Sequence, residues 1–396
     1  MIGFRDLLQI ISHQRFTFIL VVVVLGLAGW VFITQVLDPQ TVNLERANTG
    51  DPAVSDILEP IRQKYGVPAI AGAIVTPEGL WTSGVVGVRK AGTAIQATVD
   101  DQWHLGSETK AMTAVLVARL VETKLLRWDM TVAEVFPEIT IHPEAQAISI
   151  SHLLTHRAGL VANLDWGEVS QKGLISEQRL EAVRQGLADK PRNPIGTVYE
   201  YSNLGYVIVG AMIERITQSS WEDQLQKEVF APLKMTRAGF GGTGTPGKID
   251  QPWGHTKKDQ PVAGNGPTVD NPQVMGPAGT VNDSLADWSK FIADQLCGSA
   301  GMPALLHQNT YAFLHSPPFG GDYAYGWLVT QRDWGGGTVL THAGCNTMNY
   351  AVAWLAPKRK FGVIVCINQG DDEAEKACDE AAGKLIDSYC QILSNK

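Results

Sequence analysis

Cysteine and clustered basic charge are both scarce in this sequence. Its 396 residues include only five cysteines, none of them in Cys-x-x-Cys spacing, which argues against a zinc ribbon. The odd number leaves at least one thiol unpaired in a monomer. No run of Lys and Arg is longer than the three residues Lys358-Arg359-Lys360, and the formal net charge is -8. The charge pattern therefore gives no electrostatic reason to expect a nucleic-acid partner.

Only residues 16–37 form an uncharged apolar run of membrane-spanning length. At about 1.5 Å per residue, a helix of this length crosses about 30 Å of hydrocarbon. A cleaved signal peptide is the alternative, but the run is longer than a usual signal core and no clear small-x-small cleavage site follows it. Arg5 and Arg15 precede the run and Asp38 follows it, which places the N-terminus in the cytoplasm by the positive-inside tendency.

These features divide the chain into four expected parts. They are a cytoplasmic N-terminus at 1–15, a transmembrane signal anchor at 16–37, a linker at 38–50 and a catalytic domain at 51–396. The domain would lie outside the cytoplasm, in the periplasm if the source is bacterial. The composition, 44% hydrophobic and 18% charged, is ordinary for a globular enzyme and argues against extended disorder.

The two ends of the predicted domain both show patterns of strands and a covering helix, and we expect them to form a single lobe around one sheet. Apolar residues recur at helical spacing over 54–65, and Pro77-Glu78-Gly79 separates two β-branched runs as a hairpin turn would. The predicted strands are 67–76, 80–88, 338–342, 349–355 and 361–367, and an alanine-rich helix is predicted at 372–393. Helical patterns fill the middle of the chain at 107–123, 149–156, 177–189, 203–217, 221–230 and 283–296. We therefore expect an α+β fold, an antiparallel sheet flanked by N- and C-terminal helices with an inserted, mainly helical lobe, plus one N-terminal transmembrane helix.

Ser107 and Lys110 form the one Ser-x-x-Lys motif of the sequence, and it lies at the start of a predicted apolar helix. The position puts the serine at the positive end of a helix dipole, which favours a developing oxyanion. Residues three apart share a helical face, so the lysine amine can reach the serine hydroxyl, and burial would lower its pKa toward that of a usable base. A serine N-cap followed by a surface lysine is the alternative interpretation.

Two further short motifs lie later in the chain. Tyr201-Ser202-Asn203 stands just before an apolar helix; a tyrosine beside an ammonium could titrate low enough to accept the serine proton, and the Asn amide could orient a substrate carbonyl. A turn tyrosine with an Asn cap is the alternative. His342-Ala343-Gly344 ends a predicted strand, where small residues would let a substrate lie along the strand edge. His104-Leu105-Gly106 has the same spacing, so only position along the chain selects His342.

The order Ser-x-x-Lys, Tyr-x-Asn, His-x-Gly resembles the penicillin-recognising serine hydrolases, especially their class C β-lactamase-like branch, with its D-alanyl-D-alanine carboxypeptidase-like and esterase members. The stretch 148–160, I-S-I-S-H-L-L-T-H-R-A-G-L, is similar to a segment common in that branch. Further similarity lies at 232–236, 277–279 and 325–327, so the resemblance extends from about Asp51 to Asn368. It implies a β-lactamase/transpeptidase-like fold.

The resemblance also implies a role for each site residue. Ser107 attacks a carbonyl of a small-molecule or peptide substrate, Lys110 and Tyr201 handle its proton, and an acyl-enzyme then hydrolyses. The expected substrate-binding residues are Asn203, His342, Gly344 and Cys345. Among these, the Cys345 backbone N–H would form an oxyanion hole with that of Ser107. No metal or other cofactor is required.

One departure bears on the substrate. β-Lactamases of this branch usually carry Lys-Thr-Gly on the strand that here carries His342-Ala343-Gly344. A histidine supplies a weaker, pH-dependent positive charge, so we expect ester or peptide-type amide hydrolysis ahead of β-lactam hydrolysis.

Two other function classes compete with this interpretation. His152 and His156 are four apart on a predicted helix and could both face zinc, but the Glu that a zincin needs is replaced by Leu-Leu-Thr. The second is a non-catalytic relative that keeps the fold to bind peptidoglycan or a partner. Retention of Ser107, Lys110 and Tyr201 argues for catalysis instead.

Overall fold

Six strands form the central sheet, and each pairs antiparallel with its neighbours in the order β2-β1-β11-β10-β9-β8. The computed structural model describes residues 47–264 and 266–395. The strands are β1 (Ala69–Thr76), β2 (Gly79–Gly87), β8 (Leu328–Arg332), β9 (Gly337–Cys345), β10 (Tyr350–Ala356) and β11 (Phe361–Ile367). β1, the first strand along the chain, pairs with β11, the last. The N-terminal and C-terminal parts of the domain therefore meet within the sheet.

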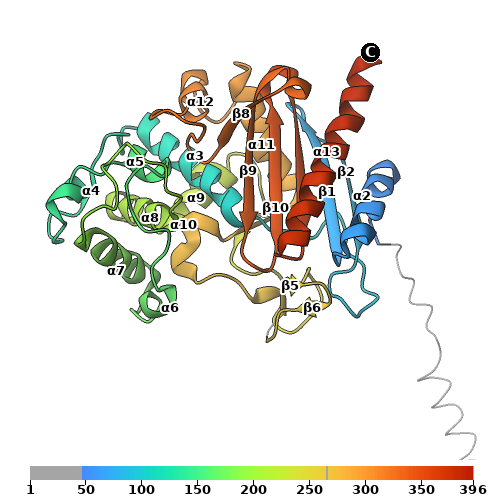
Figure 1. Ribbon diagram of the computed structural model, residues 1–396, viewed down its shortest axis with the longest axis horizontal. Helices are drawn as coiled ribbons and strands as arrows, with labels where there is room; N and C mark the ends of the chain where they lie inside the picture. Colours follow the sequence, from blue (N-terminus) through green and yellow to red (C-terminus); the bar gives the residue numbers. More distant parts are fainter. Residues whose placement is uncertain (1–46, 265, 396) are drawn as a thin grey trace, which may run out of the picture. The chain divides into compact units, whose positions relative to one another are not determined.

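Two helices from opposite ends of the domain cover one face of this sheet, and a third covers the other (Figure 1). The covering helices are α2 (Pro52–Tyr65) and α13 (Asp372–Ser394) on the first face and α11 (Leu285–Ser299) on the second. Asp51 begins α2 by accepting a hydrogen bond from the Ala53 N–H at 2.9 Å, and left-handed Gly66 ends it. The apolar stripes of α2 and α13 then share a buried core with the sheet.

The central part of the chain forms a mainly helical lobe beside the sheet (Figure 1). Its helices are α3 (Thr109–Glu122), α4 (Val132–Val135), α5 (Ile150–Leu154), α6 (Trp166–Val169), α7 (Ile175–Ala188), α8 (Asn203–Thr217), α9 (Trp221–Leu225), α10 (Gly276–Gly279) and α12 (Gln308–Leu314). α3 and α8 are buried on nearly every side, because their apolar residues encircle the helix rather than forming one stripe.

Two small sheets complete the described fold. One has the order β3-β7-β4, and the other is a two-stranded hairpin of β5 and β6. Their bounds are β3 (Gln102–His104), β4 (Gly239–Phe240), β5 (His255–Lys257), β6 (Gln260–Pro261) and β7 (Val281–Ser284). β3 leads directly into the turn that carries Ser107.

The predicted α+β architecture is confirmed, and several of its elements differ from those predicted. β8 was not predicted, because its five residues are partly exposed and include Thr330, Gln331 and Arg332. The single helix predicted over 221–230 is α9 followed by a π-helical turn, Gln226–Phe230. Pairing with β2 also begins before Asp51, since Thr49 O accepts a hydrogen bond from Val85 N–H at 3.0 Å.

No helix in the described part of the chain combines the length and apolar character needed to cross a membrane. The span predicted at 16–37 lies outside the described residues.

Candidate active site

Ser107 lies where β3 passes into a helix. Gly106 adopts a left-handed conformation (φ 51°), which turns the chain just before the serine. Glycine is required there, because a Cβ on residue 106 would lie 2.7 Å from the Cys345 backbone nitrogen. The 3₁₀ turn Gly106–Glu108 then leads into α3. The serine thus stands at the positive end of a helix dipole, as the sequence predicted.

Glu108 anchors this turn to the central sheet. Its side chain is buried, and Oε1 accepts a hydrogen bond at 3.0 Å from the backbone N–H of Ala353 in β10. Burial raises the pKa of the Glu108 carboxyl well above its ordinary value. This shift favours the neutral carboxyl, and the hydrogen bond to Ala353 ties the turn that carries Ser107 to β10.

Lys110 is fully buried one helical turn after the serine. Its Nζ lies 2.9 Å from Ser107 Oγ, 2.8 Å from Asn203 Oδ1 and 2.6 Å from the Ala278 carbonyl oxygen. Burial lowers the pKa of Lys110 well below its ordinary value. A neutral amine has two N–H bonds, and the amide and carbonyl oxygens can only accept them. Its lone pair is then left facing the serine hydroxyl, which is the geometry of a base.

Tyr201 approaches the serine from the opposite side. Ser202 caps α8 by accepting a hydrogen bond from Gly205 N–H at 3.1 Å, which sets Tyr201 just ahead of the helix. The tyrosine hydroxyl donates to Ser107 Oγ at 2.7 Å. Burial raises the pKa of Tyr201, contrary to the expectation that a neighbouring ammonium would lower it. The reason is that desolvation of the buried phenol, which disfavours the phenolate, is the largest influence on this group.

Asn203 is oriented by a residue that the sequence motifs did not identify. Its Oδ1 accepts from Lys110, while its Nδ2 donates to Asn163 Oδ1 at 2.9 Å. Asn163 belongs to a loop without a recognisable motif, so its pairing could be seen only in three dimensions. Together these contacts fix the orientation of the Asn203 amide, so that its oxygen and not its nitrogen points to Lys110.

Gly344 and Cys345, at the end of β9, lie against the serine turn. A Cβ on residue 344 would come within 2.0 Å of the Leu105 carbonyl oxygen and 2.6 Å of the Ser107 backbone nitrogen. The strand can approach this closely only as glycine. This approach brings the backbone nitrogens of Ser107 and Cys345 to the same place, where the resemblance locates the oxyanion hole.

His342 lies on the same strand, but its surroundings differ from those expected. Nδ1 is 2.8 Å from the Ala343 carbonyl oxygen, which can only accept, so Nδ1 carries the ring proton and Nε2 accepts from the Tyr323 hydroxyl at 3.0 Å. Burial, together with the charge of Lys110, lowers the pKa of His342 to about 3. The expected positive charge at this position is therefore corrected to a neutral, internally bonded imidazole.

His156 is a second residue whose contribution the motifs did not reveal. It is buried in a left-handed conformation (φ 58°), and its Nδ1 accepts from Ser202 N–H at 3.0 Å. Its ring centroid lies 4.4 Å from that of Tyr201 and 4.7 Å from that of Tyr323. A series of contacts thus runs from His342 through Tyr323 and His156 to Tyr201. The only sequence signal for it was the family-like segment in which His156 lies.

The two histidines of the zinc hypothesis occupy different surroundings. His152 Nδ1 lies 2.9 Å from Ser149 Oγ, and its ring stacks on Phe319 with centroids 4.8 Å apart. His156 instead packs among the tyrosines. Within residues 47–264 and 266–395, no cluster of three or more His, Cys, Asp or Glu is arranged to hold a metal ion.

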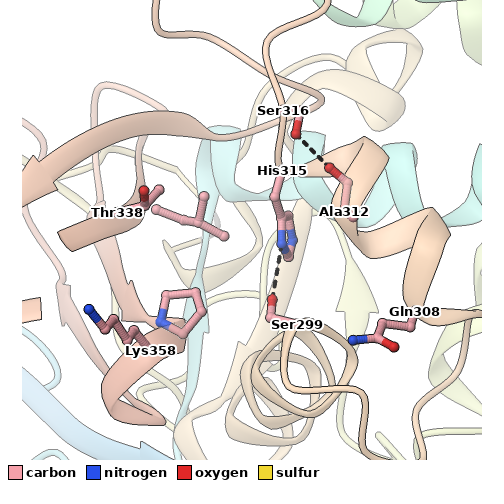
Figure 2. Close-up of a pocket in the computed structure, with 9 residues that line it drawn as sticks. Ser299, Gln308, Ala312, His315, Ser316, Thr338 and Lys358 are labelled. Atoms are coloured by element: carbon pink, nitrogen blue, oxygen red, sulfur yellow. Dashed lines mark hydrogen bonds between the residues drawn. The ribbon is translucent and has the colours of Figure 1, made fainter. Parts of the chain in front are cut away.

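A separate cavity of about 360 Å³ lies between the end of α11, α12 and the start of β9 (Figure 2). β9 runs from Thr338 at this cavity to Cys345 at the serine turn, a distance of about 23 Å at about 3.3 Å per residue. The residues that line it are Ser299, Gln308, Ala312, His315, Ser316, Thr338, Leu340, Pro357 and Lys358. None of the predicted site residues is among them.

This cavity contains a serine–histidine contact that resembles part of a catalytic triad. His315 Nδ1 lies 3.1 Å from Ser299 Oγ, as Figure 2 shows. However, the Ser299 hydroxyl donates its single proton to the Gln295 carbonyl oxygen at the shorter distance of 2.8 Å. Burial also lowers the pKa of His315 to about 4. The serine therefore has no proton to give to a weak base, and the contact is structural.

Most of the chain is similar to known proteins. Residues 54–386 match the family model described as Beta-lactamase. Penicillin-binding protein 4 from Amycolatopsis lactamdurans is 27% identical over 342 residues, which cover 79% of this chain and 84% of that protein. The solved structures that share the fold include two enzymes. A class C beta lactamase from Rhodobacter sphaeroides has a TM-score of 0.68 at 18% identity and covers 85% of this chain and 99% of its own. D-alanine carboxypeptidase AmpC from Burkholderia cenocepacia has a TM-score of 0.65 at 18% identity, with coverage of 84% and 97%.

Proposed function

The chain belongs to the beta-lactamase family, and on that premise we propose that it is a serine hydrolase that cleaves an ester or amide bond through an acyl-enzyme on Ser107. The observation that carries this proposal is the convergence of two groups on one hydroxyl. Lys110 Nζ lies 2.9 Å and the Tyr201 hydroxyl 2.7 Å from Ser107 Oγ. A hydroxyl that can give its proton to one neighbour while accepting from another is arranged for nucleophilic attack.

Acylation would begin with attack of Ser107 Oγ on the substrate carbonyl carbon as the hydroxyl proton passes to Lys110. Negative charge then develops on the carbonyl oxygen, and the backbone N–H groups of Ser107 and Cys345 would stabilise it. The bond to the leaving group breaks, and the leaving oxygen or nitrogen takes the proton from Lys110, directly or through the Tyr201 hydroxyl. The acyl group of the substrate is then left bound to Ser107 Oγ as an ester.

Deacylation would use the same groups in a second round. Lys110 accepts a proton from a water molecule, whose oxygen attacks the ester carbonyl of the acyl-enzyme. The tetrahedral intermediate collapses, the acid product leaves, and the proton returns to Ser107 Oγ. Each proton taken by Lys110 is thus given back within the same half-reaction.

The surroundings of His342 favour an uncharged group beside the scissile bond. Both ring nitrogens are already bonded within the protein, and the pKa of His342 is lowered to about 3 by burial. A neutral imidazole gives a substrate carboxylate no ionic partner. Esters and peptide-type amides are therefore proposed as substrates ahead of β-lactams, although relatives of the chain carry the names penicillin-binding protein and class C beta lactamase.

The test uses the full chain in detergent and a short-chain nitrophenyl ester. Ser107→Ala should lower the turnover rate at least about a thousandfold, because the nucleophile is lost. Ser394→Ala, which changes an exposed serine at the end of α13, should leave the rate unchanged. A chromogenic cephalosporin and a peptide ending in D-Ala-D-Ala, assayed in parallel, separate true β-lactamase and carboxypeptidase activity from esterase activity. Equal background hydrolysis by wild type and Ser107→Ala on all three would favour the non-catalytic binding protein.

We also propose that residues 16–37 anchor the chain in a membrane with the catalytic domain outside the cytoplasm. The support is the length of the uncharged run and the placement of Arg5 and Arg15 before it. After cell fractionation, the full chain should remain in the membrane pellet through an alkaline carbonate wash. A protease added outside the inner membrane should degrade the domain. Release by the wash, or protection from the protease, would contradict this topology.

A further inference from the structure

Three buried polar side chains from separate segments meet beside the serine turn. His104 ends β3, Asp270 lies in the segment between the β5–β6 hairpin and α10, and Asn346 follows β9. His104 Nε2 lies 2.7 Å from Asp270 Oδ1, and Asn346 Nδ2 donates to the same oxygen at 3.0 Å. The side chains of His104 and Asp270 are each only 4% exposed. One carboxylate oxygen thus joins two segments that are distant in sequence.

The first of these segments holds the turn before the nucleophile. His104 Nδ1 accepts a hydrogen bond from the Gly106 N–H at 3.1 Å, so in the neutral ring Nδ1 is the bare nitrogen and Nε2 carries the proton. Nε2 lies 2.7 Å from Asp270 Oδ1, close enough for an ion pair but without the geometry of a hydrogen bond. The nearby carboxylate therefore favours, by its charge, the tautomer that lets His104 hold the left-handed glycine ahead of Ser107. His104-Leu105-Gly106 is the His-x-Gly that the order of motifs did not select, and its histidine binds the backbone of its own glycine.

The second segment carries the other side of the oxyanion hole. Asn346 directly follows Cys345, and its Oδ1 accepts from the backbone N–H groups of Met348 at 3.2 Å and Asn349 at 2.8 Å. These bonds shape the turn between β9 and β10. The Nδ2 bond to Asp270 then fixes this turn relative to His104.

Stability alone does not account for Asp270. Its second oxygen, Oδ2, is buried and has no hydrogen-bond partner among the described residues. A buried carboxylate oxygen without a partner is costly, and such groups call for a specific explanation. The explanation offered by the contacts is positional, because the residues on either side of the carboxylate adjoin the two backbone donors of the site.

We propose that Asp270 is a positioning residue that sets the spacing of the two oxyanion-hole N–H groups, acting through His104 on the Ser107 side and through Asn346 on the Cys345 side. This inference rests on the proposed function. A misplacement of about 1 Å in a catalytic group can cost about a hundredfold in rate. Loss of the carboxylate should therefore reduce stabilisation of the transition state while leaving ground-state binding of the substrate intact.

The experiment compares Asp270→Ala with Asp270→Asn in the full chain. The amide oxygen of the Asn variant can still accept from both neighbours, so it should retain activity within about threefold of wild type. The Ala variant should lose about 10- to 100-fold in kcat with KM changed less than about twofold. The inhibition constant of a boronic acid that forms a tetrahedral adduct should rise by the same factor as kcat falls. Asp387→Ala, at an exposed position in α13, is the matched control and should behave as wild type.

His104→Phe provides a second route to the same answer if Asp270→Ala does not fold. It keeps a flat ring and removes the bond to Gly106, and it should show the same parallel loss of kcat and boronate affinity. The proposal is overturned if a folded Ala or Phe variant keeps full activity, or if KM rises while boronate affinity is unchanged. Failure of the proposed function looks different, because wild type itself would then neither hydrolyse the ester nor bind the boronate.

Discussion

At the scale of single residues, the two groups that contact Ser107 differ in the direction of their pKa shifts. Burial lowers the pKa of Lys110 and raises the pKa of Tyr201. Both shifts favour the uncharged form, since desolvation penalises whichever form is charged. The lysine is thereby prepared to accept a proton and the tyrosine to donate one. The bond that the Tyr201 hydroxyl donates to Ser107 Oγ agrees with the tyrosine's part in this division of roles.

This division predicts a specific pH dependence. The rate should rise as pH increases through the lowered pKa of Lys110, because only the neutral amine can act as the base. Tyr201→Phe should reduce kcat by about 10²- to 10³-fold and leave that rise at the same pH. Measurement of kcat/KM against pH for wild type, Tyr201→Phe and the neighbouring control Tyr199→Phe tests this. Disappearance of the rise in Tyr201→Phe alone would assign the base to the tyrosine instead.

The neutral state of His342 gives a second prediction. KM for a substrate that carries a carboxylate beside the scissile bond should stay flat from pH 5 to 8, because the pKa of His342 is lowered to about 3 by burial. A neutral ester of the same shape, assayed over the same range, corrects for other effects on binding. A KM that rises for the carboxylate substrate alone as pH passes about 6.5 would restore the cationic role that the sequence suggested.

The sequence pointed to residues whose proposed roles lie within a short motif and gave no sign of those whose proposed roles depend on contacts across the fold. Ser107 and Lys110 share one helical turn, and the order of motifs along the chain selected Tyr201. Asp270 and Asn163 have no such signal, because each is recognisable only by a contact with a residue far away in sequence. Burial was the other missing quantity, and it lowers the pKa of His342 to about 3, which favours a neutral ring over the expected positive charge.

At the scale of elements, strong local signals set what was predictable. α2 and α13 followed from periodic apolar residues, and the strands of the two hairpins followed from β-branched runs with turns between them. β8 has neither feature, and its place at the sheet edge is defined by pairing with β9. Such an edge strand is set by its partner more than by its own composition.

α13 offers a test of helix propensity at a position free of packing. Gly383 is exposed within this helix, and a Cβ there would meet nothing within 4 Å. Gly383→Ala should stabilise the protein by about 0.5–1 kcal/mol, because alanine loses less backbone entropy in a helix. The thermal midpoint should therefore rise slightly.

Gly72→Ala is the contrasting control for that measurement. It lies in β1 beneath the same helix, where a Cβ would come within 2.8 Å of Leu385 Cδ1. Its thermal midpoint should fall, because the added methyl overpacks the core. A decrease in the Gly383→Ala variant as large as that of Gly72→Ala would show that position 383 is constrained by something other than propensity.

At the scale of the whole molecule, buried histidines link stability to pH. Burial lowers the pKa of His315 from 6.5 to about 4, so between these values the unfolded chain binds a proton that the folded chain does not. The contribution of this residue to stability is full above pH 6.5 and is lost as the pH falls toward 4, by at most about 1.4 kcal/mol per pH unit. Calorimetry between pH 6.5 and 4.5 should give a shallower decline of the thermal midpoint for His315→Gln than for wild type. Equal slopes would mean that the imidazole takes up its proton as readily in the folded protein.

The order of strands in the central sheet has a consequence for synthesis. Ile70 of β1 pairs with Ile367 of β11, about 300 residues later in the chain. A ribosome adding about 5–20 residues per second takes about 15–60 s to supply that partner. During this interval β1, whose residues are all buried in the finished protein, has an open edge toward the missing strand. The nucleophile turn is equally incomplete, because Gly344 and Cys345 emerge more than 200 residues after Ser107. A nascent chain stalled before β9 would therefore lack the Cys345 backbone N–H and would leave the apolar edge of its first hairpin unpaired.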